Sequence, residues 1–149
     1  MTGRSPFDLG VYPKAQVLNR FVAKLIDLLI VAAGIKLVPP VGVFAGLAYI
    51  LLADGLGGGR SVGKRLIGLQ TIVPSTRDPA GFRESIIRNL PCALAQLAFE
   101  IPYVGWIAWV AILSLEALLV VGNEQGLRLG DELAKTQVLE SGQLDVRIE

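Results

Sequence analysis

Long apolar blocks alternate with short polar segments along the chain. The first two blocks are separated by Pro39-Pro40, where proline lacks the amide donor that a helix needs and restricts the residue before it. A third apolar block, from Ile86 to Val121, is too long for one ordinary membrane span and is interrupted at Pro102. We therefore expect helices at about residues 17–38, 41–56, 82–99 and 103–121.

Blocks of this length match the hydrocarbon core of a bilayer, which a helix crosses with about 20 residues. The pattern predicts an all-α membrane protein, built as a bundle of four transmembrane helices. If the last block is one long kinked span, the number of crossings falls to three. Tyr103, Trp106 and Trp109 cluster just after the break, where an aromatic belt at a membrane interface would fall.

The polar segments complete the predicted organisation. Residues 1–16 form an N-terminal arm, residues 17–138 a membrane domain, and residues 139–149 a C-terminal tail. Residues 68–73 and 136–139 have strand-like patterns, and we expect them to pair as two short strands. The polar middle of the chain, residues 60–88, and the tail would then form a small cytoplasmic cap under the helices.

The distribution of Lys and Arg predicts the orientation. With four crossings, both termini and the middle loop lie on one side, which then holds every Lys and Arg except Lys36. The positive-inside rule makes that side cytoplasmic. With three crossings, Arg128 and Lys135 would lie outside. Four crossings fit better and predict a multi-pass protein of a prokaryotic-type plasma (inner) membrane, with both termini in the cytoplasm.

Composition narrows the function classes. The chain is 52% hydrophobic and 18% charged, with a mean hydropathy of +0.56, against about 25% charged for soluble domains. A net charge of +1 gives no field that attracts nucleic acid. The chain has no His, and its single Cys92 forms no internal disulfide and no zinc cluster. These features argue against an enzyme, a cofactor and a metal site.

The first helix carries an ionisable stripe. Arg20, Lys24 and Asp27 lie at i, i+4 and i+7 and so share one face. Ionisable groups at membrane depth are expensive and normally face the bundle interior or water. One hypothesis makes Asp27 the titrating group of a cation or proton site. The other, which we favour because two cations keep a carboxylate ionised, is a locked ion pair of Asp27 with Arg20, Lys24 or Arg128.

Other polar and small residues mark the predicted helices. Glu116 in the fourth helix is either a second carboxylate of an ion path or a group that hydrogen-bonds inside the bundle. Gly42 and Gly46 form a GxxxG step, which lets another helix approach closely.

Gly58, Gly63 and Lys64 match the first part of a phosphate-loop pattern. The match fails at Arg65, where that loop needs a Ser or Thr to hold magnesium, and no clear strand precedes the segment. We interpret it instead as a glycine-rich turn whose Lys64 and Arg65 contact anionic lipid headgroups.

Three segments together resemble the RDD family of multi-pass membrane proteins, which is named for an Arg and two Asp. They are Arg20–Asp27 in the first helix, Ser61–Leu69 after the second, and Arg128–Val138 in the tail. The resemblance implies that Arg20, Asp27 and Asp131 are the motif residues. We expect Asp131 to pair with Arg20 or with a basic residue of the segment 63–65. Lys135 stands where the family usually has a Gly, at the point where a tight turn is expected.

The resemblance implies transport of an ion or small ligand, including sodium–proton exchange. Because four helices make a thin bundle, a pathway predicts a homo-oligomer in the lipid bilayer. The alternative is a non-catalytic scaffold that assembles with other membrane proteins through Gly42–Gly46 and the fourth helix. A transporter should direct more than one deep carboxylate into a shared cavity, whereas a scaffold should bury Asp27 in a salt bridge.

Overall fold

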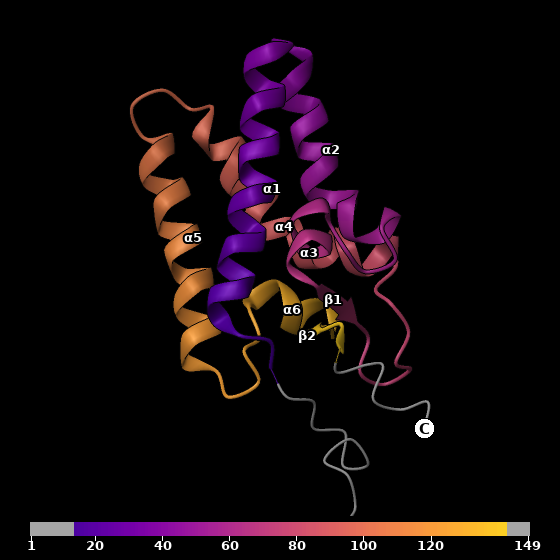
Figure 1. Cartoon of the computed structure of the whole chain (residues 1–149). Helices are drawn as coiled ribbons and strands as arrows, with labels where there is room; N and C mark the ends of the chain where they lie inside the picture. Colours follow the sequence, from indigo (N-terminus) through magenta and orange to yellow (C-terminus); the bar gives the residue numbers. More distant parts are fainter. Residues whose placement is uncertain (1–13, 143–149) are drawn as a thin grey trace, which may run out of the picture.

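The computed structural model describes residues 14–142, and this part of the chain folds into six helices and one two-stranded sheet (Figure 1). The four long helices are α1 (Val17–Leu37), α2 (Val41–Leu56), α4 (Phe82–Phe99) and α5 (Gly105–Gly122). Two short helices, α3 (Val62–Ile67) and α6 (Leu129–Ala134), lie beside the strands β1 (Leu69–Ile72) and β2 (Gln137–Glu140). The long helices begin and end close to their predicted bounds, whereas α3 and α6 were not predicted.

The long helices form two hairpins. The turn between α1 and α2 contains Pro39-Pro40, and the turn between α4 and α5 spans residues 100–104. Both turns lie at the top of Figure 1, and the short helices and strands lie at the bottom. The hairpins join through α2 and α4, whereas α1 and α5 make no extensive contact with each other.

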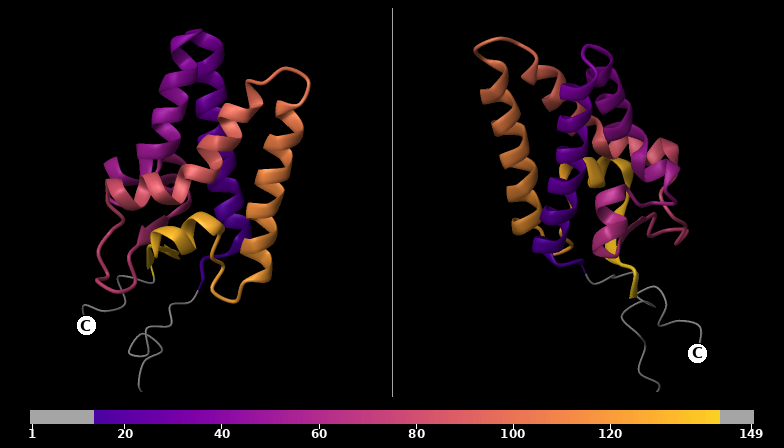
Figure 2. Two further views of the ribbon diagram at one scale, coloured as in Figure 1. Left: turned by 180° about the vertical axis from the view of Figure 1, so that it is seen from behind. Right: turned by 45° about the horizontal axis from the view of Figure 1, so that its top comes forward.

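α4 changes direction within the bundle. Its first half lies almost flat at the lower end of α2, and its second half rises toward the α4–α5 turn (Figure 2). Pro91 lies inside the helix, where proline removes one backbone hydrogen bond and crowds the preceding turn. The first half of α4 carries Arg88, which contacts Asp54 and Asp131.

The Gly42–Gly46 step packs against α1 of the same chain. A Cβ added to Gly42 would lie 2.2 Å from the carbonyl oxygen of Gly34, and one added to Gly46 would lie 2.8 Å from Cγ1 of Val31. Glycine is therefore required at this crossing, as the GxxxG pattern predicted. Because α1 covers this face, it is not open to another membrane protein, and that part of the scaffold hypothesis is wrong.

The cap contains the expected strand pair. β1 and β2 are antiparallel, with Leu69 opposite Glu140 and Ile72 opposite Gln137. The pairing predicted between residues 68–73 and 136–139 is confirmed, with each strand slightly displaced from its predicted range. Among the described residues, no strand precedes α3, because β1 comes after it in the chain. The phosphate-loop pattern therefore lacks the strand that should precede it.

The apolar core is divided into two clusters. The lower one joins the cap to the start of α1 and contains Ala15, Ala23, Leu69 and Val138. The upper one lies between the long helices and contains Val31, Ile50, Cys92 and Ala93. Buried charged side chains lie between the two clusters, at the level where the helices meet the cap.

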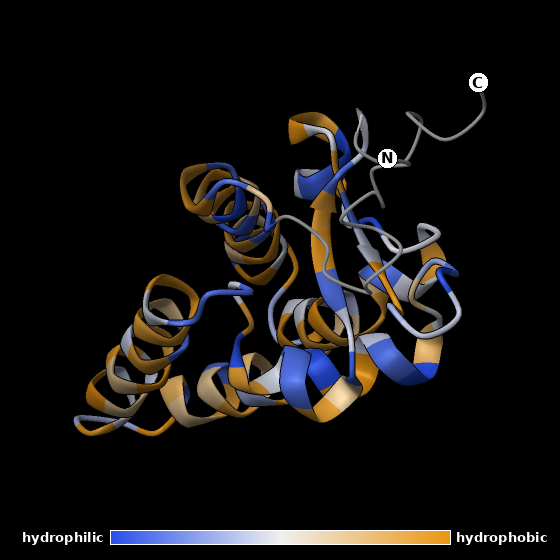
Figure 3. Cartoon of the chain, turned by 90° about the horizontal axis from the view of Figure 1, so that it is seen from below, coloured by the Kyte–Doolittle hydropathy of each residue, from blue (hydrophilic) through white to orange (hydrophobic). Residues whose placement is uncertain are grey.

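One helix in the described part of the chain, α5, is long and apolar enough to span a membrane by length and composition. α2 is apolar but shorter. α1 carries four charged residues along its length: Arg20, Lys24, Asp27 and Lys36. Hydrophobic positions dominate the long helices, while hydrophilic positions cluster in the short helices and connecting segments (Figure 3).

Candidate functional site

Asp27 lies where α1 meets α2 and α3. Its carboxylate accepts hydrogen bonds from the Tyr49 hydroxyl at 2.7 Å, from the Ser61 hydroxyl at 2.6 Å and from the Gly63 amide at 2.9 Å. A Cβ on Gly63 would lie 2.0 Å from the carbonyl oxygen of Ala23, so only glycine lets α3 approach α1 this closely. The sequence therefore places a backbone donor against a buried carboxylate.

The predicted ion pair of Asp27 with Arg20, Lys24 or Arg128 is wrong. Within the described residues Asp27 makes no ion pair, and all three of its donors are neutral groups. The physical reason is the unpredicted α3, whose first turn brings a hydroxyl and an amide to the carboxylate. Three hydrogen bonds satisfy an ionised carboxylate without a neighbouring cation.

Asp54, near the end of α2, is the second buried carboxylate. It accepts from Lys64 Nζ at 2.5 Å and from the Ser61 amide at 3.0 Å, and Arg88 Nη1 lies 3.5 Å away. Lys64 also donates to the Thr71 hydroxyl at 3.0 Å. The expected contact of Lys64 with lipid headgroups is therefore corrected, because its ammonium points into the protein. Arg65 remains exposed, and its headgroup contact stays a prediction.

Asp131 is the third and most enclosed carboxylate, with its side chain fully buried. Arg20 Nη2 and Arg88 Nη2 each lie 2.8 Å from one of its oxygens, and Arg128 Nε lies at 3.4 Å. Arg20 also donates to the carbonyl oxygen of Gly126. The expected pairing of Arg20 with Asp131 is confirmed, and it ties α1 to α6.

The cap charges have shifted pKa values. Burial alone would raise the pKa of Asp131, but the guanidiniums of Arg88, Arg128 and Arg20 hold it well below its usual range. Burial, reinforced by the positive charge of Arg88 and opposed by Asp54, lowers the pKa of Lys64 to about 7. Asp131 therefore stays ionised at neutral pH, and the fold depends on that charge.

Glu116 comes from α5 and is buried. Arg128 Nε lies 3.6 Å from one of its oxygens, and neither oxygen has a hydrogen bond to another described residue. Of the two hypotheses for Glu116, a group satisfied by hydrogen bonds inside the bundle does not fit this environment. Its carboxylate is held only by one loose ion pair.

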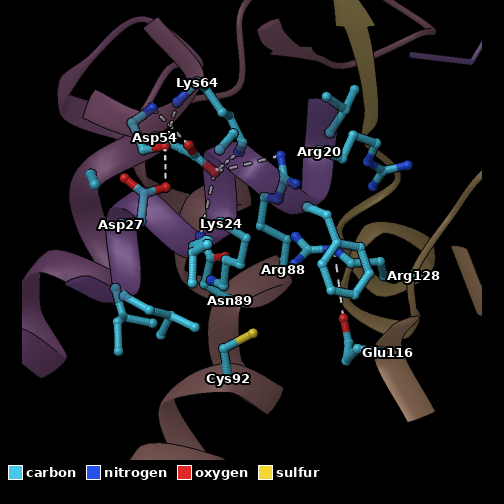
Figure 4. A pocket seen from close by; sticks show the side chains of 18 of the residues that line it. Arg20, Lys24, Asp27, Asp54, Lys64, Arg88, Asn89, Cys92, Glu116 and Arg128 are labelled. Atoms are coloured by element: carbon cyan, nitrogen blue, oxygen red, sulfur yellow. Dashed lines mark hydrogen bonds and ion pairs between the residues drawn. The ribbon is translucent and has the colours of Figure 1, made fainter. Parts of the chain in front are cut away.

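These side chains surround one cavity of about 180 Å³ (Figure 4). Its acidic lining residues are Asp27, Asp54 and Glu116. Its basic lining residues are Arg20, Lys24, Lys64, Arg88 and Arg128. Asp131 lies behind this wall, against three of the basic residues. Five helices and the segment before α6 therefore direct ionisable groups into a shared space inside the bundle.

Sequence reasoning found some of these residues and missed others. The predicted stripe of Arg20, Lys24 and Asp27 does face one cavity, and Glu116 faces it from α5. Asp54 and Arg88 were missed as site residues. The signal for Asp54 was its place as the acidic residue of an otherwise apolar helix. Arg88 looked like one more cation of the polar middle until the bend of α4 placed it under the bundle.

No set of three or more His, Cys, Asp or Glu side chains within residues 14–142 is placed to hold a metal ion. Two of the acidic groups at the cavity, Asp54 and Glu116, have basic partners, which is an arrangement that suits charged or polar ligands more than a bare cation.

Comparison with known proteins gives one match. The family model described as "RDD family" matches residues 33–135. That range includes Asp54, Arg88 and Asp131, whereas Arg20 and Asp27 precede it. No curated protein and no solved structure matches the chain.

Proposed function

The chain belongs to the RDD family, which is membrane-associated, and from this premise we propose that it is a multi-pass membrane protein that carries a small charged ligand through the cavity of its bundle. One observation supports transport above all. Asp27, Asp54 and Glu116 reach the same cavity from three different helices. A shared cavity with several deep carboxylates is what distinguishes a transporter from a scaffold.

Exposed apolar surface supports four crossings. Each long helix exposes large apolar side chains, such as Leu29 on α1, Phe44 on α2, Leu94 on α4 and Leu118 on α5. Contiguous apolar surface of this extent is unfavourable in water and suits a lipid environment. α1 has 21 residues, which corresponds to about 30 Å at 1.5 Å per residue and matches a bilayer core.

The distribution of polar groups supports the orientation with both ends on one side. The cap and the ends of the described chain lie opposite the two hairpin turns. Tyr103 and Trp106 are exposed beside the α4–α5 turn, at the level of the far interface. The basic residues gather at the cap side, which the positive-inside rule makes cytoplasmic.

Charge balance favours an anionic ligand over sodium. Five basic side chains line the cavity, against three acidic side chains that line it and Asp131 behind them. This leaves one positive charge in excess. Lys24 has no hydrogen bond or ion pair among the described residues. The positive charge of this lysine would repel a sodium ion, whereas it would attract an anion.

Flux in proteoliposomes tests the proposal. Vesicles containing the parent protein should take up inorganic phosphate faster than empty vesicles, and Lys24→Gln should lose most of that uptake. Sodium- and pH-sensitive dyes in the same vesicles, with Asp27→Asn as the variant, test sodium–proton exchange directly. The matched control is Lys36→Gln, an exposed lysine at the other end of α1.

A scaffold is the second candidate, and the triple pairing of Asp131 favours it. Arg20, Arg88 and Arg128 tie α1, α4 and α6 together through this one carboxylate. This set of ion pairs gives the Arg and Asp residues of the family motif a structural role that needs no transport. If folded protein gives no phosphate, sodium or proton flux above empty vesicles, transport is overturned and the scaffold remains.

A further inference from the structure

The cavity opens toward one side of the bundle. α1 packs against α2 and α3, and α5 packs against α4, while α1 and α5 make no extensive contact with each other. Both helices nevertheless line the cavity. The space between them therefore faces the surroundings of the bundle, which is the lipid core if the chain crosses the membrane as proposed.

The walls of this opening are apolar. Those on α1 are Phe21, Leu25 and Leu28, and those on α5 are Leu113, Ala117 and Val120. Aliphatic walls on both sides give no hydrogen bond to a dissolved ion. They are suited to a hydrocarbon chain, which prefers an apolar environment to water.

The floor of the cavity has the opposite character and contains unsatisfied groups. The half-buried Lys24 makes no hydrogen bond or close ion pair with the described residues, although its charge acts on Asp54, and the buried Nε of Arg88 donates no hydrogen bond to them. Both oxygens of Glu116, whose residue is 5% exposed, lack a hydrogen bond as well. Buried polar groups without partners are costly, so each one indicates a missing acceptor or donor.

One chemical class supplies all three. A phosphodiester oxygen accepts from Lys24 and from Arg88, a headgroup hydroxyl donates to Glu116, and an acyl chain lies between the apolar walls. We propose that the cavity binds an acidic phospholipid with a hydroxyl-bearing headgroup, of the phosphatidylglycerol type, which enters between α1 and α5. The inference rests on the proposed position of the chain in the bilayer, and it gives the same cavity a lipid occupant in place of a small dissolved anion.

Other occupants satisfy only part of this surface. Dissolved phosphate pairs with the floor and leaves the aliphatic walls empty. A helix from a second copy of the chain covers the walls, but apolar side chains alone leave Lys24 and Arg88 without an acceptor. The combination of apolar walls and a basic floor therefore selects an anionic amphiphile.

Native mass spectrometry of the full chain in detergent micelles tests the assignment. The protein is titrated with phosphatidylglycerol and with phosphatidylcholine of the same acyl chains. We expect the parent to prefer phosphatidylglycerol by about tenfold, which is the scale of one charge-assisted hydrogen bond. Lys24→Gln should abolish the preference, and Lys36→Gln, which changes an exposed lysine of the same helix, should retain it.

A second pair of variants tests the walls without touching the charges. Ala117→Trp places a large side chain in the cavity and should block the lipid, whereas Ala111→Trp, on the exposed side of α5, should leave binding unchanged. Equal loss in both tryptophan variants would mean that the lipid binds elsewhere and would overturn the assignment.

Two further outcomes oppose the lipid. Equal binding of the two phospholipids to the parent, or equal losses in the two lysine variants, shows general adhesion and overturns the site. Displacement of the lipid by excess inorganic phosphate shows that the floor alone selects the ligand, and overturns the role of the walls. Because binding is measured without flux, a failure here is distinct from a failure of transport.

Discussion

The two ends of the helical bundle are held together in different ways. At the cap end, Asp27, Asp54 and Asp131 each have at least three donors or cationic partners, and most of these come from segments far apart in the sequence. Toward the turn end, Val31, Ile50 and Cys92 form an apolar cluster that packs against side chains such as Leu47 and Leu113. The outward faces at that end are exposed and apolar.

The difference follows from the physics of an apolar environment. Lipid tails are as apolar as leucine, so helices in lipid associate by close packing at small residues rather than by hydrophobic burial. Such packing is weakly directional. Buried charges are directional, because each must find its partner or incur a large desolvation cost. The buried charges at the cap end therefore determine which helices and strands contact one another. The packing at the turn end requires only that the side chains fit together.

Removing Asp131 should have the largest effect and would break the cap end selectively. Asp131→Asn leaves Arg20 and Arg88 without their shared counter-charge, and loss of one partner of a buried ion pair costs about 3–5 kcal/mol. A thermal melt in detergent, followed by circular dichroism, measures it. The exposed neighbour Glu132 provides the control, since Glu132→Gln should change stability by less than about 0.5 kcal/mol. Equal melting temperatures of the two variants would show that the ion pairs of Asp131 do not stabilise the fold.

Removing a buried apolar side chain from the upper cluster should cause the next largest loss of stability. Ile50→Ala removes a buried side chain from the upper cluster and should cost about 2–4 kcal/mol. Leu118→Ala, on the exposed face of α5, removes similar volume and should change the melting temperature little. If the two substitutions were equally harmful, packing inside the bundle would not be what holds this end.

Acid should weaken the cap end through Asp131. Its pKa is lowered in the folded protein, so its contribution is complete above the unfolded value, near pH 4, and is lost as the pH falls toward the lower folded value. Each proton taken up contributes at most about 1.4 kcal/mol per pH unit. Melting temperatures measured from pH 6 to pH 2 should therefore fall more steeply in the parent than in Asp131→Asn. Parallel curves would assign the acid sensitivity to other groups.

The smallest expected effect is a gain in stability. Lys135 ends α6 with a φ of 53°, in the left-handed region that favours glycine, and its side chain is exposed. The tight turn expected there forms even though glycine is absent. Lys135→Gly should stabilise the cap by about 0.5–1 kcal/mol, because it relieves the left-handed strain at some entropic cost. Gly68→Ala, at a φ of 76° after α3, should have the opposite sign in the same melt.

The contrast between the two ends also explains what could be predicted. Helix bounds follow from local signals, since Pro39-Pro40 and Pro102 interrupt apolar blocks whose length is visible in the sequence. The strand pair was predictable from its pattern. The two short helices were not, because residues 62–67 and 129–134 are stabilised by the carboxylates and helices they contact.

The sequence by itself determined the number of long helices and the close helix approach at Gly42–Gly46, and the family resemblance offered Arg20 as one of two alternative partners of Asp131. Only the tertiary structure decided the partners of the other carboxylates. Asp27 binds donors 34 and 36 residues away, and Arg88 reaches Asp131 because α4 bends. The physical reason is range: helix length and turn position depend on neighbouring residues, whereas a buried charge accepts any donor that the fold brings within about 3 Å.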